Sequence, residues 1–214
     1  MAHKPPATQT AEQTRQRLLG ATETLVVREG VVSLSVRRIA SEADVNSALI
    51  RYHFGDVEGL LRELAHLNAI QIRDARDRLL DGLDAAPSPD FAASVDALVL
   101  PLWAPAALSR DQRAIVVLDE IYARATLALH EAIWREFASG VARVTQLLRR
   151  ALGGEVDEMA LAWRIRFVTA AALDVPPRSP RSEEHPRSAI YGRDTSEERL
   201  AQFRRFAQQA LRVI

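Results

Sequence analysis

The sequence predicts an all-α protein in which a small N-terminal helical domain precedes a larger helical one. Apolar residues recur at intervals of three and four from Thr10 onward, which is the spacing of one face of a helix. Residues that favour helix N-caps stand in front of several of these segments. The 214 residues include only nine glycines, too few for the many tight turns of an all-β fold.

Two helices are expected first. One runs from Thr10, the start of a capping box, to Gly30, where the helix can stop. The next is capped by Ser35 and breaks near Asp44. It is expected to pack against a third short helix at residues 47–53, which Asn46 can cap. The apolar residues expected to hold this pair together are Ile39, Ala40, Val45, Ile50 and Phe54.

A fourth helix, from Asp56 to about Leu80, keeps helical spacing over the longest stretch of the chain. A boundary with two prolines follows it at residues 87–90. Further helices are expected at 90–100, from a second capping box at Ser109 towards Leu129, and at 130–152, 156–174 and 196–213. The polar, proline-rich composition of residues 176–194 predicts a mobile loop.

Charge and composition restrict the possible functions. The 28 basic and 28 acidic residues cancel, so overall charge does not by itself indicate a nucleic-acid partner. The absence of cysteine excludes disulfides, thiolate catalysis and cysteine-bound zinc, and it suits the cytoplasm, where we expect the protein. No apolar run approaches the ~20 residues that cross a bilayer, and residues 1–10 lack the apolar stretch of a signal peptide, so we expect no membrane partner.

No arrangement of residues typical of catalysis occurs in the sequence. The five histidines are scattered, and His130-Glu131 lacks a second histidine four residues after the first, where Trp134 stands. There is no glycine-rich phosphate loop, nucleophile elbow or regularly spaced carboxylate cluster. The sequence therefore predicts a protein that is not an enzyme, with no catalytic residue, metal or cofactor.

Residues 35–56 read SVRRIASEADVNSALIRYHFGD. This segment predicts two short helices joined by a tight turn. The outer face of the second helix would be free to enter a DNA major groove about 12 Å wide. With the helix that ends in Glu29-Gly30 before it and the pair Leu60-Leu61 after it, this segment resembles the DNA-binding domain of the tetracycline-repressor (TetR) family. The resemblance covers residues 10–65, and beyond them it is only architectural.

The resemblance implies a flexible tail at residues 1–9, a helix-turn-helix domain at 10–55, and a helical sensor and dimerisation domain at 56–214. It further implies a transcriptional regulator, a repressor that binds a palindromic operator in double-stranded DNA as a homodimer and is released by a small-molecule effector. The neutral charge supports an alternative, a helical small-molecule-binding or interaction protein that retains an unused helix-turn-helix.

The family's roles can be carried over by position. Ser35 and Arg38 would contact phosphates, and Arg51 would contact a guanine edge or a phosphate. Aspartate tolerates the left-handed conformation of a tight turn, so Asp44 can stand where the family often has glycine, whereas Val57 replaces a common lysine. The alternative for residues 51–53 is an ordinary solvated surface. The residues expected at or near DNA from the turn and third helix are Asn46, Ser47, Ala48, Leu49, Arg51, Tyr52 and His53.

Aromatic residues spread over the later helices could line a pocket for an apolar or aromatic ligand, although each one alone fits an ordinary core position. Two apolar stripes near the C-terminus predict a dimer interface, and the resemblance implies four helices about a two-fold axis. The candidate ligand-binding residues are Trp103, Tyr122, Trp134, Phe137, Trp163 and Phe167. The candidate interface residues are Met159, Trp163, Phe167, Leu200, Phe203, Ala207 and Leu211.

Overall fold

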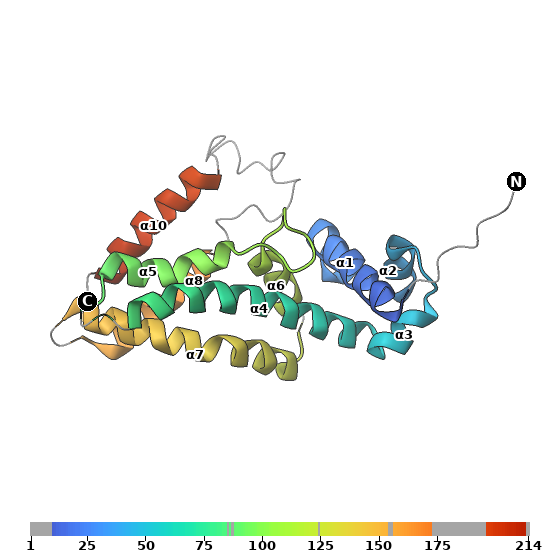
Figure 1. The fold of residues 1–214 in the computed structure, drawn as a ribbon, viewed down its shortest axis with the longest axis horizontal. Coiled ribbons are helices and arrows are strands. Elements are labelled where there is room, and N and C mark those ends of the chain that lie inside the picture. Colours follow the sequence, from blue (N-terminus) through green and yellow to red (C-terminus); the bar gives the residue numbers. More distant parts are fainter. Residues whose placement is uncertain are drawn as a thin grey trace, which may run out of the picture.

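The computed structural model describes residues 10–84, 86, 88–123, 125–153, 156–172 and 196–212. Within these ranges all the regular elements are helices, which confirms the predicted all-α fold (Figure 1). Two long helices, α4 (Val57–Asp84) and α7 (Leu127–Leu152), lie side by side along an elongated molecule. The expected tail at 1–9 and the expected loop at 176–194 lie outside the described residues.

Three helices form the N-terminal end of the molecule: α1 (Ala11–Glu29), α2 (Val36–Ala43) and α3 (Ala48–Phe54), with a 3-10 turn, η1 (Val31–Ser33), between the first two. The predicted capping box opens α1. The backbone N–H of Gln13 donates to Thr10 Oγ1 at 3.2 Å, and the backbone N–H of Thr10 donates to Gln13 Oε1 at 3.0 Å. Gly30 ends α1 with a φ of 79°, a conformation that favours glycine.

The core of this N-terminal domain is the one that apolar spacing predicts. Ile39, Ala40 and Ile50 are buried, and Val45 and Phe54 are partly buried against the same core. Helix α1 packs on both α2 and α3 and covers these side chains. Close packing on a shared core fixes α2 and α3 relative to each other.

Helix α4 is the central helix of the larger domain. Its residues Leu60, Leu64, Ile72 and Leu80 are fully buried, and it packs against α6 and α7. The helical spacing of these leucines and isoleucine gives α4 one continuous apolar face. The other elements are α5 (Phe91–Val99), η2 (Leu100–Trp103), α6 (Ala114–Tyr122), α8 (Glu158–Ala172) and α10 (Ser196–Arg212).

The segment before α6 differs from the prediction. Ser109 does not open a helix, because its hydroxyl donates to Asp111 at 2.5 Å instead of capping, and α6 begins only at Ala114. Residues 104–113 form a loop closed by a bridge between Pro105 and Arg113. The next helix, α7, begins at Leu127 rather than 130, because the Thr126 hydroxyl caps it by accepting from the Leu129 amide.

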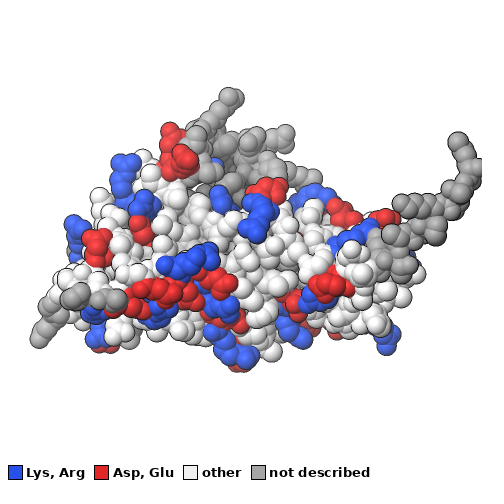
Figure 2. Space-filling model, viewed as in Figure 1, with Lys and Arg blue, Asp and Glu red and all other residues white. Residues whose placement is uncertain are grey.

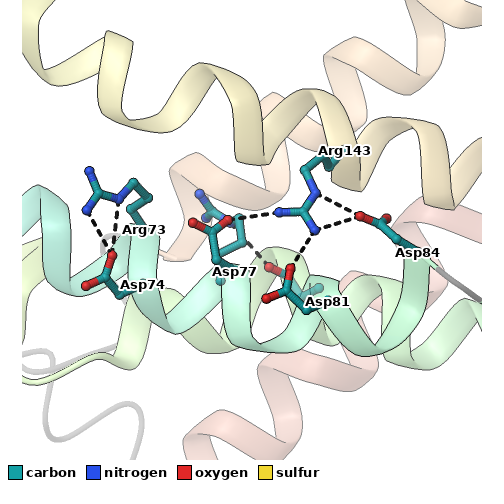
Figure 3. Close-up of polar contacts among 8 residues, drawn as sticks. Arg73, Asp74, Asp77, Asp81, Asp84 and Arg143 are labelled. Atoms are coloured by element: carbon teal, nitrogen blue, oxygen red, sulfur yellow. Dashed lines mark hydrogen bonds and ion pairs between the residues drawn. The ribbon is translucent and has the colours of Figure 1, made fainter.

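Ion pairs join the solvent-facing edges of α4 and α7 (Figure 3). The guanidinium of Arg143 on α7 contacts Asp77 at 3.1 Å, Asp81 at 2.9 Å and Asp84 at 2.6 Å, all on α4. Hydrogen bonds to Asp81 and Asp84 raise the pKa of Arg143. One arginine thus holds three like charges that would otherwise repel along one face of α4.

A close approach between two helices depends on Gly59. The Asp56 carboxylate accepts from the Gly59 amide at 2.7 Å and so caps α4, as predicted. A Cβ atom on Gly59 would lie 2.1 Å from the carbonyl oxygen of Phe54, the last residue of α3. Only a residue without a side chain lets α4 start this close to the end of α3.

We predict that Gly59→Ala lowers the free energy of unfolding by about 2–3 kcal/mol, because the backbone of Phe54 has to move. Gly82→Ala is the matched control in the same helix. A Cβ there meets nothing within 4 Å, and alanine is favoured over glycine in helices by up to about 1 kcal/mol. Urea unfolding of both variants measures the difference, and equal midpoints would contradict the proposed clash.

Candidate nucleic-acid interface

The turn between α2 and α3 is set by backbone geometry. Ser35 Oγ accepts from the Arg38 amide at 3.3 Å and caps α2, as predicted. Asp44 ends α2 with φ 51° and ψ 54°, the left-handed conformation expected of it. Arg17 of α1 donates to the Asp44 carbonyl at 3.1 Å and contacts its carboxylate at 3.3 Å. The left-handed backbone of Asp44 and the contacts of Arg17 from α1 therefore fix the conformation of the turn.

The third helix starts one residue later than predicted. Its N-cap is Ser47, and the side-chain oxygen of Asn46 accepts from the Ala48 amide at 2.8 Å. Ile50 is buried in the core, whereas the next residue, Arg51, is exposed. An exposed face on a helix anchored in this way can enter a groove without changing its own conformation.

The structure places the nine predicted DNA-contact residues on this domain's surface or at its edge. Tyr52 is 78% exposed, which is unusual for so large a side chain and leaves its ring available to a partner. The ring of His53 lies edge-on to Tyr52 with 4.9 Å between centroids. The exposed residues are Ser35, Arg38, Asn46, Ser47, Ala48, Arg51 and Tyr52, and the half-buried ones are Leu49 and His53.

Carboxylates neutralise some of the arginines of this domain. Arg38 pairs with Glu29, and Arg28 pairs with Glu29 at 2.9 Å and with Glu42 at 3.1 Å. The hydrogen bond from Arg28 lowers the pKa of Glu29, which keeps that carboxylate charged. On the face shown in Figure 2, basic and acidic side chains accordingly lie next to one another at the α1–α3 end.

Two arginines of the helix-turn-helix are not neutralised in this way. Arg37 and Arg51 are exposed and form no ion pair with any residue in the described ranges. Their charges are the ones available for phosphate or base contacts. Arg37 was not among the predicted DNA-contact residues, and its position two residues after the Ser35 cap is the signal that could have included it.

The six aromatic candidates for ligand binding do not meet in one cavity. Trp103 is buried against Phe203, with 5.5 Å between ring centroids. Tyr122 lies on His130 at the surface, Trp134 is exposed, and Phe137 is partly buried against the core. The last two, Trp163 and Phe167, stack on each other and are exposed.

An open cavity of about 480 Å³ lies elsewhere, between the end of α3 and the helices α4 and α7. Its lining mixes apolar and charged side chains, and none of the six aromatic candidates takes part in it. The lining residues are His53, Phe54, Gly59, Arg62, Glu63, His66, Leu129, Ala132, Ile133, Arg135 and Glu136.

The apolar stripe of α10 that was predicted to lie in a dimer interface is largely covered by the same chain. Phe203, Ala207 and Leu211 are buried within the chain itself, because α10 packs against α5 and α8, and Leu200 is half-buried. These side chains have little surface left for a second subunit. The exposed apolar residues of this region are Met159, Trp163 and Phe167 on α8 and Phe206 on α10.

A buried polar network joins the N-terminal domain to the larger one. Glu23 of α1 and Asn68 of α4 are both fully buried. Asn68 Nδ2 donates to Glu23 Oε1 at 2.9 Å, and the Leu108 amide donates to Glu23 Oε2 at 3.1 Å. Asn68 Oδ1 accepts from the Ala107 amide at 3.1 Å. Both carboxylate oxygens of Glu23 are thus used to attach α1 to α4 and to the loop before α6.

We predict that Glu23→Gln lowers the free energy of unfolding by about 1–3 kcal/mol, because an amide nitrogen would face one of the two donors and leave it unsatisfied. Burial raises the pKa of the Glu23 carboxyl in spite of the bonds from Asn68 and Leu108. The folded protein therefore binds this proton more tightly than the unfolded chain does. The stabilisation by the proton is present below the unfolded pKa and is lost as pH rises through the folded pKa.

The difference in the free energy of unfolding between wild type and Glu23→Gln should accordingly narrow as pH rises through the folded-state pKa of Glu23. Urea unfolding at several pH values measures this difference. Glu12→Gln, at an exposed position of the same helix, is the control and should stay within about 0.5 kcal/mol of wild type. A difference between wild type and Glu23→Gln that widens with pH would contradict the assignment.

Other kinds of site find no support in the described part of the chain. None of its helices combines the length and apolar character needed to span a membrane. Its histidine, aspartate and glutamate side chains form no group of three or more that could hold a metal ion.

Part of the N-terminal domain matches a known family of proteins. Residues 18–64 match the family of bacterial regulatory proteins called the tetR family. No curated protein matches the sequence. The whole chain is similar in fold to solved structures of such regulators.

One of these structures is the TetR family transcriptional regulator PfmR from Thermus thermophilus, 17% identical with a TM-score of 0.64, covering 92% of this chain and 97% of that one. A TetR-family regulator from Rhodococcus sp. is 18% identical with a TM-score of 0.62, covering 94% and 98%. One from Vibrio parahaemolyticus is 19% identical with a TM-score of 0.55, covering 92% and 97%. At such identities the likeness shows a shared fold.

Proposed function

We propose that this protein is a ligand-responsive repressor of transcription, because residues 18–64 match the tetR family of bacterial regulatory proteins and the chain shares the fold of solved structures of such regulators. It binds a palindromic operator as a homodimer in the cytoplasm and is released by a small molecule. The observation that carries this proposal is the exposed face of α3, where Arg51 stands without a counter-charge in the described structure. We assign DNA binding to residues 10–55, and sensing and dimerisation to 56–214.

The contacts of the helix-turn-helix divide into two kinds. Arg51 lies on the exposed face of α3, where a guanidinium can bond to the O6 and N7 atoms of guanine in the major groove. Arg38 lies on α2 beside the Ser35 cap, at the position for a phosphate contact, although it must first exchange its pairing with Glu29. A phosphate contact positions the protein, and a base contact selects the sequence.

We predict that Arg51→Ala costs about 1–3 kcal/mol of binding to the operator and relaxes the preference for it over other sequences. Arg38→Ala should weaken binding to all sequences about equally and lower the salt dependence. Fluorescence anisotropy at several salt concentrations, with an operator selected from random duplex DNA, measures both effects. An equal loss of sequence preference in the two variants would show that the roles are assigned wrongly.

The dimer would form on the exposed apolar face of α8. Met159, Trp163 and Phe167 are spaced by four residues, so they lie on one side of the helix, and each is more than half exposed. Phe206, on the neighbouring helix α10, is 50% exposed. Apolar side chains that cluster at the surface of a soluble protein mark an interaction site. Two recognition helices on one palindrome require such a symmetric pair of subunits.

We predict that Trp163→Glu converts the dimer into monomers, because a carboxylate would have to be buried without a partner. Trp134→Glu is the matched control, since Trp134 is 56% exposed on α7 and lies away from the proposed interface. Light scattering at micromolar protein concentration measures the mass. Dissociation of both variants, or of neither, would place the interface elsewhere.

A second candidate function follows from the charge balance. The pairs of Arg38 with Glu29 and of Arg28 with Glu42 reduce the positive charge that the domain offers to phosphates. This favours a helical small-molecule-binding protein whose helix-turn-helix is unused. A mobility-shift assay on the DNA upstream of the coding region separates the two candidates, because only the regulator should retard that fragment at physiological salt.

A further inference from the structure

A second exposed apolar face lies on α7, apart from the one on α8. Trp134 is 56% exposed and Leu127 is 74% exposed. They are seven positions apart, and residues at that spacing differ by only about 20° in direction around a helix, so both lie on one side of α7. Ala138, four residues after Trp134, is half-buried on the same side. Exposed apolar side chains grouped in this way mark an interaction surface, and the dimer on α8 does not use it.

Two charges without a counter-charge stand beside this apolar side of α7. Glu131 and Arg135 are exposed, and neither forms an ion pair with any residue in the described part of the chain. Arg135 Nε donates to the backbone carbonyl of Glu131 at 3.3 Å, which leaves the carboxylate unused. Glu136 and Arg143 of the same helix, in contrast, are paired with charges on α4. An exposed tryptophan flanked by one free charge of each sign suits a partner that carries the same combination.

The pattern is complementary to itself. In an antiparallel pair of α7 helices related by a two-fold axis, residues before the axis face residues after it, and the second copy makes the same contacts with the roles exchanged. With the axis next to Trp134, the two indole rings meet, and Glu131 of each copy faces Arg135 of the other. In the same register Leu127 faces Ala138, whose small side chain leaves room for it. One register therefore matches apolar with apolar and each charge with its opposite.

Such a contact is too small to hold two copies together in dilute solution. A few side chains from one helix of each copy bury less than about 1,200 Å², the lower end of the range for stable interfaces. A weak contact becomes effective when something else holds the partners close, because the effective concentration is then about millimolar. Two dimers on neighbouring sites of one DNA molecule are held in this way.

The position of this side of α7 fits that situation. Helix α7 lies along one edge of the molecule and begins at the end nearer α3 (Figure 1). The hydroxyl of Thr126, which caps α7, donates to Glu58 in the first turn of α4 at 3.4 Å. The surface is therefore lateral and near the start of α4, which directly follows α3, whereas α8 packs against α5 and α10.

We infer that this surface of α7 joins two dimers bound to neighbouring operators, so that the protein binds DNA cooperatively. Its partner is a second copy of this chain. The inference rests on the proposed function, which supplies the DNA that holds the dimers together. Its consequence is that occupancy of paired sites changes more steeply with the amount of free protein. We call this surface the α7 face, and it consists of Leu127, Glu131, Trp134, Arg135 and Ala138.

Cooperativity on DNA with two operators tests the α7 face in the full-length protein. Duplexes carry one or two operators selected from random DNA, and the spacing between the two is varied through two helical turns. We expect the second dimer to bind at least about tenfold more tightly than the first at favourable spacings. Trp134→Glu should remove this gain, because two carboxylates would meet at the axis, and should bind one operator within about twofold of wild type. Gln146→Glu, at an exposed position later in α7, is the control and should keep the gain.

Charge exchange tests whether the partner is a second copy. Glu131→Arg and Arg135→Glu should each weaken the cooperativity, by about threefold or more, because like charges then face each other across the axis. The chain that carries both substitutions should regain most of it, since every facing pair is again opposite in sign. A double variant no more cooperative than the single ones would overturn the proposed pairing.

The possible outcomes separate this inference from the proposed function. Normal binding to one operator without cooperativity on two, or cooperativity that Trp134→Glu retains, overturns the α7 face and leaves the regulator in place. Conversion of the dimer into monomers by Trp134→Glu also overturns it, because α7 would then form the dimer itself. If the wild type retards no DNA, the regulator is rejected and sedimentation at millimolar protein concentration decides. Tetramers that Trp134→Glu does not form would support the α7 face, and the absence of tetramers would overturn it.

Discussion

Two fully buried polar side chains fix how the N-terminal domain sits on the rest of the molecule. Glu23 and Asn68 satisfy each other and two backbone amides of the loop before α6. Removing either partner would leave a buried donor or acceptor without water, which is far more costly than losing an exposed bond. Apolar contacts between α1 and α6 could tolerate sliding, whereas these directional bonds specify one arrangement.

This attachment gives α3 two mechanical connections to the larger domain. One runs through α4, which begins directly after α3 and passes close to Phe54 at Gly59. The other runs from the loop at residues 104–113 through Glu23 into α1, on which α2 and α3 pack. A change in the larger domain can therefore reposition the helix-turn-helix as a unit. Coupling of this kind needs two packed arrangements of similar energy.

Local chemistry explains which parts of the fold could be predicted from the sequence. Thr10, Ser35 and Asp56 are capping residues, and their role depends on neighbours three positions away, so the helices they open begin within a residue or so of the prediction. Ser109 had the same pattern, but its hydroxyl bonds to Asp111, which a pattern of residue types does not reveal. Spacing also located the apolar core of the helix-turn-helix, because packing there is between neighbours in sequence.

Contacts between distant segments could not be predicted in the same way. The apolar stripe on α10 was visible, but periodicity does not tell whether a stripe is covered by the same chain, as Phe203 is, or by another subunit. Arg76 stands in the charged stretch RDARDR, and only the folded position of α5 shows that it is buried. Glu23 offered a better signal, since it lies four residues from the buried Leu19 on an otherwise apolar face.

The acidic partners of the arginines in the N-terminal domain affect how a DNA-binding protein of this kind would search a genome. Attraction to phosphates acts at every site, so a strongly basic domain spends most of its time on irrelevant DNA. Glu29 and Glu42 weaken that general attraction, and a rare correct site must compete with millions of others. Occupancy of the correct DNA site would then depend chiefly on base contacts and on the presence of two subunits. More of the protein could then remain free to find the correct site, and each single half of that site would retain it less strongly.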